Sequence, residues 1–132
     1  MTINIRRIYE PPTEHDGQRV LVDRIWPRGV SREEAALDLW LKDIAPSTQL
    51  RKWFGHDPSR FDAFRDRYRQ ELEHNPQAVA ELAALAKKGD VLLLYSAHDK
   101  QFNQAVVLAE YLKGLDPDIG AGNGIGRKRD EP

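Results

Sequence analysis

The chain of 132 residues contains no cysteine, and this absence excludes a whole class of chemistry. Disulfide bonds, thiolate nucleophiles and thiolate metal ligands are all ruled out. The four histidines lie in separate segments, and none has the spacing to a second histidine or a carboxylate that a metal site on one helix needs. We therefore predict no metal site.

Long apolar runs and an excess of charge of one sign are also missing. The longest apolar run, Val91 to Leu94, is far shorter than the roughly 20 residues of a membrane-spanning helix, and the N-terminus lacks the apolar segment of a signal peptide. Acidic and basic side chains nearly cancel, with a formal net charge of -1, so no large basic surface is predicted. We expect a cytoplasmic protein without a membrane partner. Nucleic acid stays open as a partner, without support from the charge.

Glycine-rich loops that bind phosphate are absent as well. The glycines at positions 120, 122, 124 and 126 follow no predicted strand. Almost no apolar side chain accompanies them, so residues 116–132 cannot pack a core and are predicted to form a disordered, glycine-rich tail. Residues 1–115 have the length of a single α/β domain.

Four segments have the pattern of β-strands. Residues 19–23 and 90–96 contain continuous apolar runs, which are typical of central parallel strands that are covered on both faces. Residues 2–9 alternate between apolar and polar side chains. The connection to the next strand is too short for a crossover helix, so the first two strands pair antiparallel or lie apart. Residues 37–44 fit a third strand that ends at Lys42-Asp43, or nearly as well a two-turn helix.

Helix caps divide the rest of the chain. Ser31 and Glu34 form a capping-box pair that predicts a short helix through Ala36. Further helices are predicted over residues 47–55, 57–74, 75–89 and 102–114 from their cap residues and their apolar spacing. Together these elements predict a three-layer α/β fold, with a mainly parallel sheet of about four strands flanked by helices.

A cluster of charged and aromatic residues directly follows the second predicted strand. Asp23, Arg24, Trp26 and Arg28 lie within six residues. Ligands bind at this carboxyl edge in open α/β sheets, and guanidinium groups grip phosphate or carboxylate in bidentate fashion. The tryptophan is suited to stack on a base, to wall a pocket or to form a hydrophobic lid. In the structural alternative, Arg24 or Arg28 pairs with a nearby carboxylate and only ties loops together.

A second group follows the last predicted strand, on what we expect to be the same edge of the sheet. It consists of Tyr95, Ser96 and His98, joined by Asn103 and Gln104 at the start of the last helix, where the helix dipole favours an anion. We expect both groups to line one cleft. Each residue also has an ordinary structural role open to it: Ser96 as a helix cap, Tyr95 in the core and His98 in an exposed loop. No glycine elbow surrounds Ser96, so a nucleophilic serine is not favoured.

Three functions fit these residues. The first is an enzyme or binding protein for a small anionic ligand, phosphate-bearing or not, contacted by Arg24, Arg28 and Trp26. The second is a nucleic-acid-associated regulator or processing factor, with the same arginines on phosphates and Trp26 or Trp40 stacked on bases. The third is a protein-interaction module around Trp40 and Trp53. The sequence does not define catalytic residues, a cofactor or an oligomeric state.

Several motifs resemble those of a known family. They are the string Asp-Arg-Ile-Trp-Pro-Arg-Gly at residues 23–29, Ala36-Leu37-Asp38 with Trp40, Pro46-Ser47 with Leu50-Arg51, and Leu94-Tyr95-Ser96-Ala97 followed by Asn103. The chain is similar to the YeaO-like branch of the domain-of-unknown-function 488 family over about residues 3–114. This resemblance implies a small bacterial α/β domain and carries over no catalytic residue. Many members of the wider family have cysteines where this chain has Tyr95 and Ser96, so cysteine chemistry is not implied here.

Overall fold

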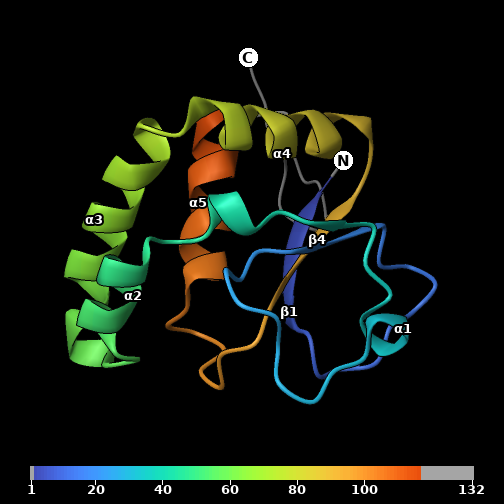
Figure 1. The fold of residues 1–132 in the computed structure, drawn as a ribbon. Coiled ribbons are helices and arrows are strands. Elements are labelled where there is room, and N and C mark those ends of the chain that lie inside the picture. The colour runs from blue at the N-terminus through green and yellow to red at the C-terminus, as the bar shows by residue number, and fades with distance from the viewer. Residues whose placement is uncertain (1, 117–132) are drawn as a thin grey trace.

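The computed structural model describes residues 2–116, which form a four-stranded parallel sheet with helices on both sides (Figure 1). The strands are β1 (Ile3–Arg7), β2 (Gln18–Leu21), β3 (Leu39–Trp40) and β4 (Val91–Tyr95). Their order across the sheet is β1-β4-β2-β3, and every neighbouring pair is parallel. Residues 117–132, and with them nearly all of the predicted disordered tail, lie outside the described residues.

The helices enclose the sheet from two sides and make the fold three-layered. They are α1 (Arg32–Ala35), α2 (Thr48–Phe54), α3 (Phe61–Glu73), α4 (Pro76–Lys88) and α5 (Gln104–Leu115). In Figure 1, α2, α3 and α5 lie to the left of β1 and β4, α4 runs across the top, and α1 lies to the right. The larger core, against α2 to α5, includes Val20 and Leu93, and the smaller core, under α1, includes Leu21 and Ala35. The predicted three-layer α/β fold is confirmed.

The first two strands lie apart, on either side of β4. Ile3 of β1 and Gln18 of β2 are both level with Val91. The connection enters β2 through Gly17, which has a φ of +72° and passes so close to Asp90 that a Cβ atom would lie 2.4 Å from its carbonyl oxygen. Glycine is therefore required here, so that the Gln18 amide can donate to that carbonyl at 2.9 Å.

The third strand is much shorter than predicted. β3 contains only Leu39 and Trp40, and a 3-10 helix, Lys42–Ile44, follows where the strand was expected to continue to Lys42-Asp43. Leu41 and Ile44 are both buried, and their spacing of three residues brings them to one side of a 3-10 turn. The packing of these two side chains therefore overrides the apolar and polar alternation of the segment.

The segment between β3 and α2 is fastened to α3 by two side chains. The buried Tyr68 hydroxyl donates to the Ile44 carbonyl at 2.6 Å. The Glu71 carboxylate accepts from the amide of Ser47 at 2.8 Å and from its hydroxyl at 2.6 Å, and Ser47 in turn caps α2. These contacts fix the start of α2, which contributes one wall of the cavity described below.

Tyr68→Phe is expected to lower the free energy of unfolding by about 1–2 kcal/mol, because the Ile44 carbonyl loses its donor in a buried place. Urea unfolding followed by circular dichroism measures the difference. Tyr111→Phe is the matched control, since the Tyr111 hydroxyl makes no hydrogen bond within residues 2–116. Equal losses in the two variants would contradict the prediction.

Candidate functional site

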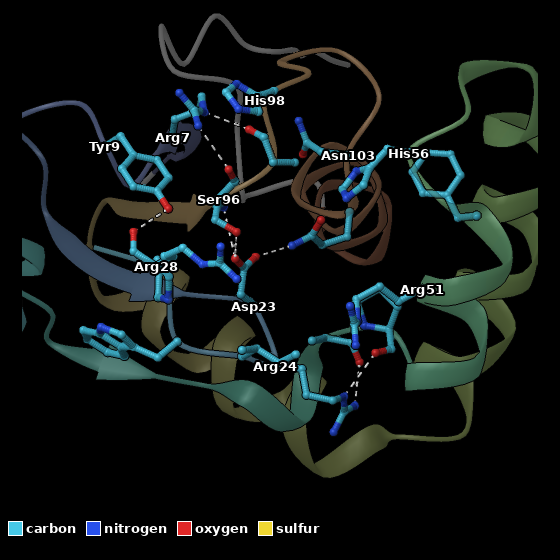
Figure 2. A pocket seen from close by; sticks show the side chains of 18 of the residues that line it. Arg7, Tyr9, Asp23, Arg24, Arg28, Arg51, His56, Ser96, His98 and Asn103 are labelled. Carbon is cyan, nitrogen blue, oxygen red and sulfur yellow. Dashed lines mark hydrogen bonds between the residues drawn. The ribbon is translucent and has the colours of Figure 1, made fainter. Parts of the chain in front are cut away.

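A cavity of about 860 Å³ opens at the carboxyl edge of the sheet. The ends of β1 and β2, the loop after β4, helix α2 and the first turn of α5 contribute to its lining. Eight of the predicted residues line it: Asp23, Arg24, Trp26, Arg28, Ser96, His98, Asn103 and Gln104 (Figure 2). They meet because parallel strands end on the same edge of the sheet.

Tyr95 is the exception and does not line the cavity. Its side chain is buried in the larger core, on the same side of the sheet as Leu93. Successive strand residues face opposite sides of a sheet, so Tyr95 follows the inward direction of Leu93. Burial also raises the pKa of its hydroxyl. Tyr95 is therefore a core residue, and its expected position in the cleft is corrected.

Asp23 supplies the one carboxylate among the lining residues in the described part of the chain, and both of its oxygens are engaged. One oxygen accepts from the Ser96 amide at 3.0 Å and from the Ser96 hydroxyl, and the other accepts from the Gln104 side-chain amide. Burial raises the pKa of the Asp23 carboxyl, while these hydrogen bonds and the positive charge of Arg51 offset part of the increase. Asp23 thus fastens the end of β2 to the loop after β4 and to α5.

Two arginines of the cavity are held by neutral partners. Arg7 donates to the Ala97 carbonyl at 2.8 Å and to the Ser96 carbonyl at 3.2 Å. Arg24 donates to the carbonyls of residues 45 and 46 at 3.0 and 3.2 Å. Arg24 therefore ties two loops together, which is the structural role considered for it from the sequence. It does so through backbone carbonyls and not through a carboxylate. Carbonyls carry no net charge, so both guanidinium groups keep their positive charge, and neither forms an ion pair within residues 2–116.

Arg28 and Arg51 have no direct partner. Both side chains are exposed at the cavity, and neither guanidinium group makes a hydrogen bond or ion pair within residues 2–116. The backbone of Arg28 is nevertheless anchored, since the Tyr9 hydroxyl donates to its carbonyl at 2.9 Å. Figure 2 shows the Arg28 side chain extending from this anchor toward Asp23. Its guanidinium group is therefore available to a ligand.

Asn103 lies at the cavity and caps α5. Its side-chain oxygen accepts from the Val106 amide at 3.1 Å, and its side-chain nitrogen donates to the Asp99 carbonyl at 2.8 Å. Helix α5 therefore begins at Gln104, whereas it was predicted to begin at Phe102. The bond to Asp99 uses one of the two N–H groups of the amide, and the anion-donor role of Asn103 stays a prediction that rests on the other.

Trp26 and His98 border the cavity in different ways. The Trp26 indole is half-buried and donates to the Val30 carbonyl at 2.7 Å, which fixes the ring. His98 is exposed and has no partner in the described part of the chain.

Arg7 and His56 also line the cavity and were not predicted. The place of Arg7 follows from the pairing of β1 with β4, which the sequence does not specify.

Metal ligands and membrane helices are not found in the described part of the chain. Residues 2–116 contain no group of three or more histidine, cysteine, aspartate or glutamate side chains that is arranged to hold a metal ion. Over the same range, every helix is too short or too polar to cross a membrane.

Comparison with known proteins identifies the family of this chain. Residues 2–116 match a family model described as the inactive DUF488-N3 subclade. The chain belongs to the DUF488 family. It is 45% identical to the uncharacterized protein YeaO of Escherichia coli over 115 residues, which cover 87% of this chain and 100% of YeaO. Uncharacterized proteins of Mycobacterium bovis and Mycobacterium tuberculosis are 43% identical over 112 residues, covering 85% of this chain and 94% of each relative. No solved structure matches the chain.

The motif resemblance to the YeaO-like branch of the DUF488 family is thereby confirmed. Every residue that lines the cavity lies within residues 2–116, the range that matches the family model. The cavity therefore belongs to the part of the chain that this DUF488 member shares with the family model.

Proposed function

We propose that this DUF488 protein binds a small anionic ligand in the cavity at the carboxyl edge of the sheet. The balance of charge in the lining supports this function. Four arginines, Arg7, Arg24, Arg28 and Arg51, line the cavity together with one carboxylate, that of Asp23. Both oxygens of Asp23 accept from uncharged donors, and none of the four arginines forms an ion pair within residues 2–116. Guanidinium groups bind phosphate or carboxylate.

Binding is favoured over catalysis because the matching subclade is described as inactive. The Ser96 hydroxyl donates to one oxygen of Asp23, and the Gln104 side-chain amide donates to the other. These contacts join β2 to the loop after β4 and to α5, which is a structural role for both side chains.

The two alternative functions have less support. A nucleic-acid surface would continue in the open from Arg51 to Lys52, and Lys52 does not line the cavity. The Trp40 indole donates to the Asp23 carbonyl at 2.8 Å, and its ring packs edge-on against Trp26 with the centroids 5.3 Å apart. These internal contacts favour a structural role for Trp40 over a role in protein interaction.

Arg28→Ala tests the proposed function most directly. The stability of the free protein is expected to change by less than about 0.5 kcal/mol, because the exposed guanidinium group has no protein partner within residues 2–116. The stabilisation that the parent protein gains from added phosphate is expected to be lost, since that gain depends on ligand affinity. Urea unfolding of both proteins with and without phosphate measures the two quantities.

Lys52→Ala is the matched control for charge, because Lys52 is exposed on α2 and lies outside the cavity lining. It is expected to leave phosphate stabilisation unchanged. A large loss of stability in Arg28→Ala with phosphate stabilisation intact would refute the ligand role of Arg28.

A further inference from the structure

We infer that the ligand of this cavity is a mononucleotide, an organic phosphate that carries sugar hydroxyls and a planar base. This inference rests on the proposed anion binding and makes it more specific. Three properties of the cavity support it: its size, its two separate cationic sides and its mixture of apolar wall and hydrogen-bond acceptors.

The cavity is much larger than an inorganic oxyanion. Its volume of about 860 Å³ is in the range of pockets that enclose drug-sized organic molecules. A tetrahedral oxyanion would fill a small part of this space and leave the rest to water. A ligand that fills the cavity therefore has an organic body in addition to its anionic group.

The positive groups lie on two sides of Asp23 and not in one cluster. Figure 2 shows Arg7 and Arg28 on one side, near Ser96, and Arg51 and His56 on the other. A small oxyanion contacts one of these sides only. We assign the phosphate to the side of Arg28, where Arg7 supplies a second guanidinium group, and the base to the side of His56, where the aromatic residues of the lining lie.

The wall on the side of His56 suits a planar ring. Phe54 and Phe64 line the cavity there and stack on each other with ring centroids 4.4 Å apart. The ring centroid of His56 lies 6.2 Å from that of Phe54. His56 has a φ of +57°, a left-handed conformation that non-glycine residues seldom adopt and that is often retained at functional sites. The exposed imidazole beside this aromatic wall provides a surface on which a base can stack.

The floor between the two sides offers hydrogen-bond acceptors. The Gln104 amide nitrogen donates to Asp23, which leaves the Gln104 carbonyl oxygen without a partner in the described residues. This oxygen and the remaining lone pairs of Asp23 accept from hydroxyl or N–H donors. A fully ionised oxyanion has no such donor, whereas ribose hydroxyls and base nitrogens supply several.

Isothermal titration of the full chain at pH 8 tests the inference with the four ribonucleoside monophosphates, ribose 5-phosphate and inorganic phosphate. The tightest of the nucleotides is expected to bind at least about tenfold more tightly than ribose 5-phosphate, the gain typical of one stacked base. His56→Asn removes the imidazole and keeps a residue that tolerates the left-handed conformation. It is expected to weaken nucleotide binding several-fold and to leave ribose 5-phosphate binding unchanged, while Arg28→Ala weakens both.

The outcomes separate this inference from the function on which it rests. Equal affinities for the nucleotides, ribose 5-phosphate and inorganic phosphate would overturn the mononucleotide and leave anion binding intact. No binding of any of these phosphates would overturn the proposed function itself. A single-stranded oligonucleotide that binds far more tightly than every mononucleotide would also overturn a free mononucleotide as the ligand.

Discussion

Asp16→Ala is expected to lower the free energy of unfolding by about 3–5 kcal/mol, because it leaves a buried guanidinium group without its counter-ion. The side chain of Arg19 is 6% exposed, and its Nη1 lies 2.6 Å from one Asp16 oxygen. Arg6 of β1 lies 2.7 Å from the other oxygen. Arg19 also donates to the Ala35 carbonyl at the end of α1. Loss of the carboxylate therefore disturbs the contacts between β1, β2 and α1 together.

Urea unfolding at pH 7 measures the effect of Asp16→Ala, and Asp62→Ala is the control. Asp62 also pairs with an arginine three residues away, but its side chain is 97% exposed. A solvent-exposed pair of this kind contributes about 0–1 kcal/mol. A similar small loss in both variants would show that burial of the Asp16 pair does not determine its strength.

The contribution of Asp16 should depend on pH. Burial favours its protonated form, but hydrogen bonds from Thr13, Arg6 and Arg19 outweigh burial and lower the pKa of the carboxyl below its usual value. A group with a lowered pKa in the folded state stabilises fully above its unfolded pKa of about 3.9 and loses this contribution as the pH falls through the folded pKa. The difference between the parent protein and Asp16→Ala should therefore shrink below about pH 4.

Local signals in the sequence predicted most of the elements correctly. The capping box of Ser31 and Glu34 and the cap formed by Ser47 are present as expected, because these contacts need only neighbouring residues. The buried Asp16 network was not predicted. Asp16 and Gly17 have ordinary turn chemistry, and the approach of Arg6 depends on the order of strands across the sheet, which no local pattern encodes.

The residues that line the cavity could be predicted only in part. The rule that parallel strands end on one edge was sufficient to bring the ends of β2 and β4 together. It did not specify the direction of each side chain, so Tyr95 was included although it faces the core. It also did not identify β1 as the neighbour of β4, so Arg7 was overlooked. His56 was overlooked although the end of α2 was predicted, because the approach of that end to the cavity depends on the packing of the whole fold.

Asp23→Ala is expected to lower the free energy of unfolding by about 2–4 kcal/mol, because the Ser96 amide, the Ser96 hydroxyl and the Gln104 amide lose their shared acceptor. Asp23→Asn is expected to be neutral or stabilising at pH 7. Its side-chain oxygen can accept from Ser96, and its nitrogen can donate to Gln104 once the Gln104 amide turns over. Urea unfolding of both variants measures the difference between losing the hydrogen bonds and losing the charge.

The pH dependence of Asp23 is opposite in sign to that of Asp16. Burial raises the pKa of Asp23 in the folded state, so its contribution to stability falls as the pH rises from the unfolded pKa of about 3.9 through the folded pKa. Asp23→Asn removes the charge that causes this loss. Relative to the parent protein, Asp23→Asn should therefore gain stability as the pH rises above about 4, and a difference that stays constant with pH would contradict the raised pKa.

The same substitution should strengthen anion binding, which distinguishes a ligand cavity from a purely structural cluster. Asp23→Asn removes the one negative side chain from the described lining and leaves the four arginines unchanged. A unit charge about 10 Å from a bound anion alters its affinity on the order of tenfold at an effective dielectric constant of about 20, and a closer charge alters it more. Phosphate titrations at low and high salt should show tighter binding to Asp23→Asn, with a smaller gain at high salt because mobile ions screen the interaction. Unchanged phosphate affinity in a folded Asp23→Asn protein would mean that anions do not bind in this cavity.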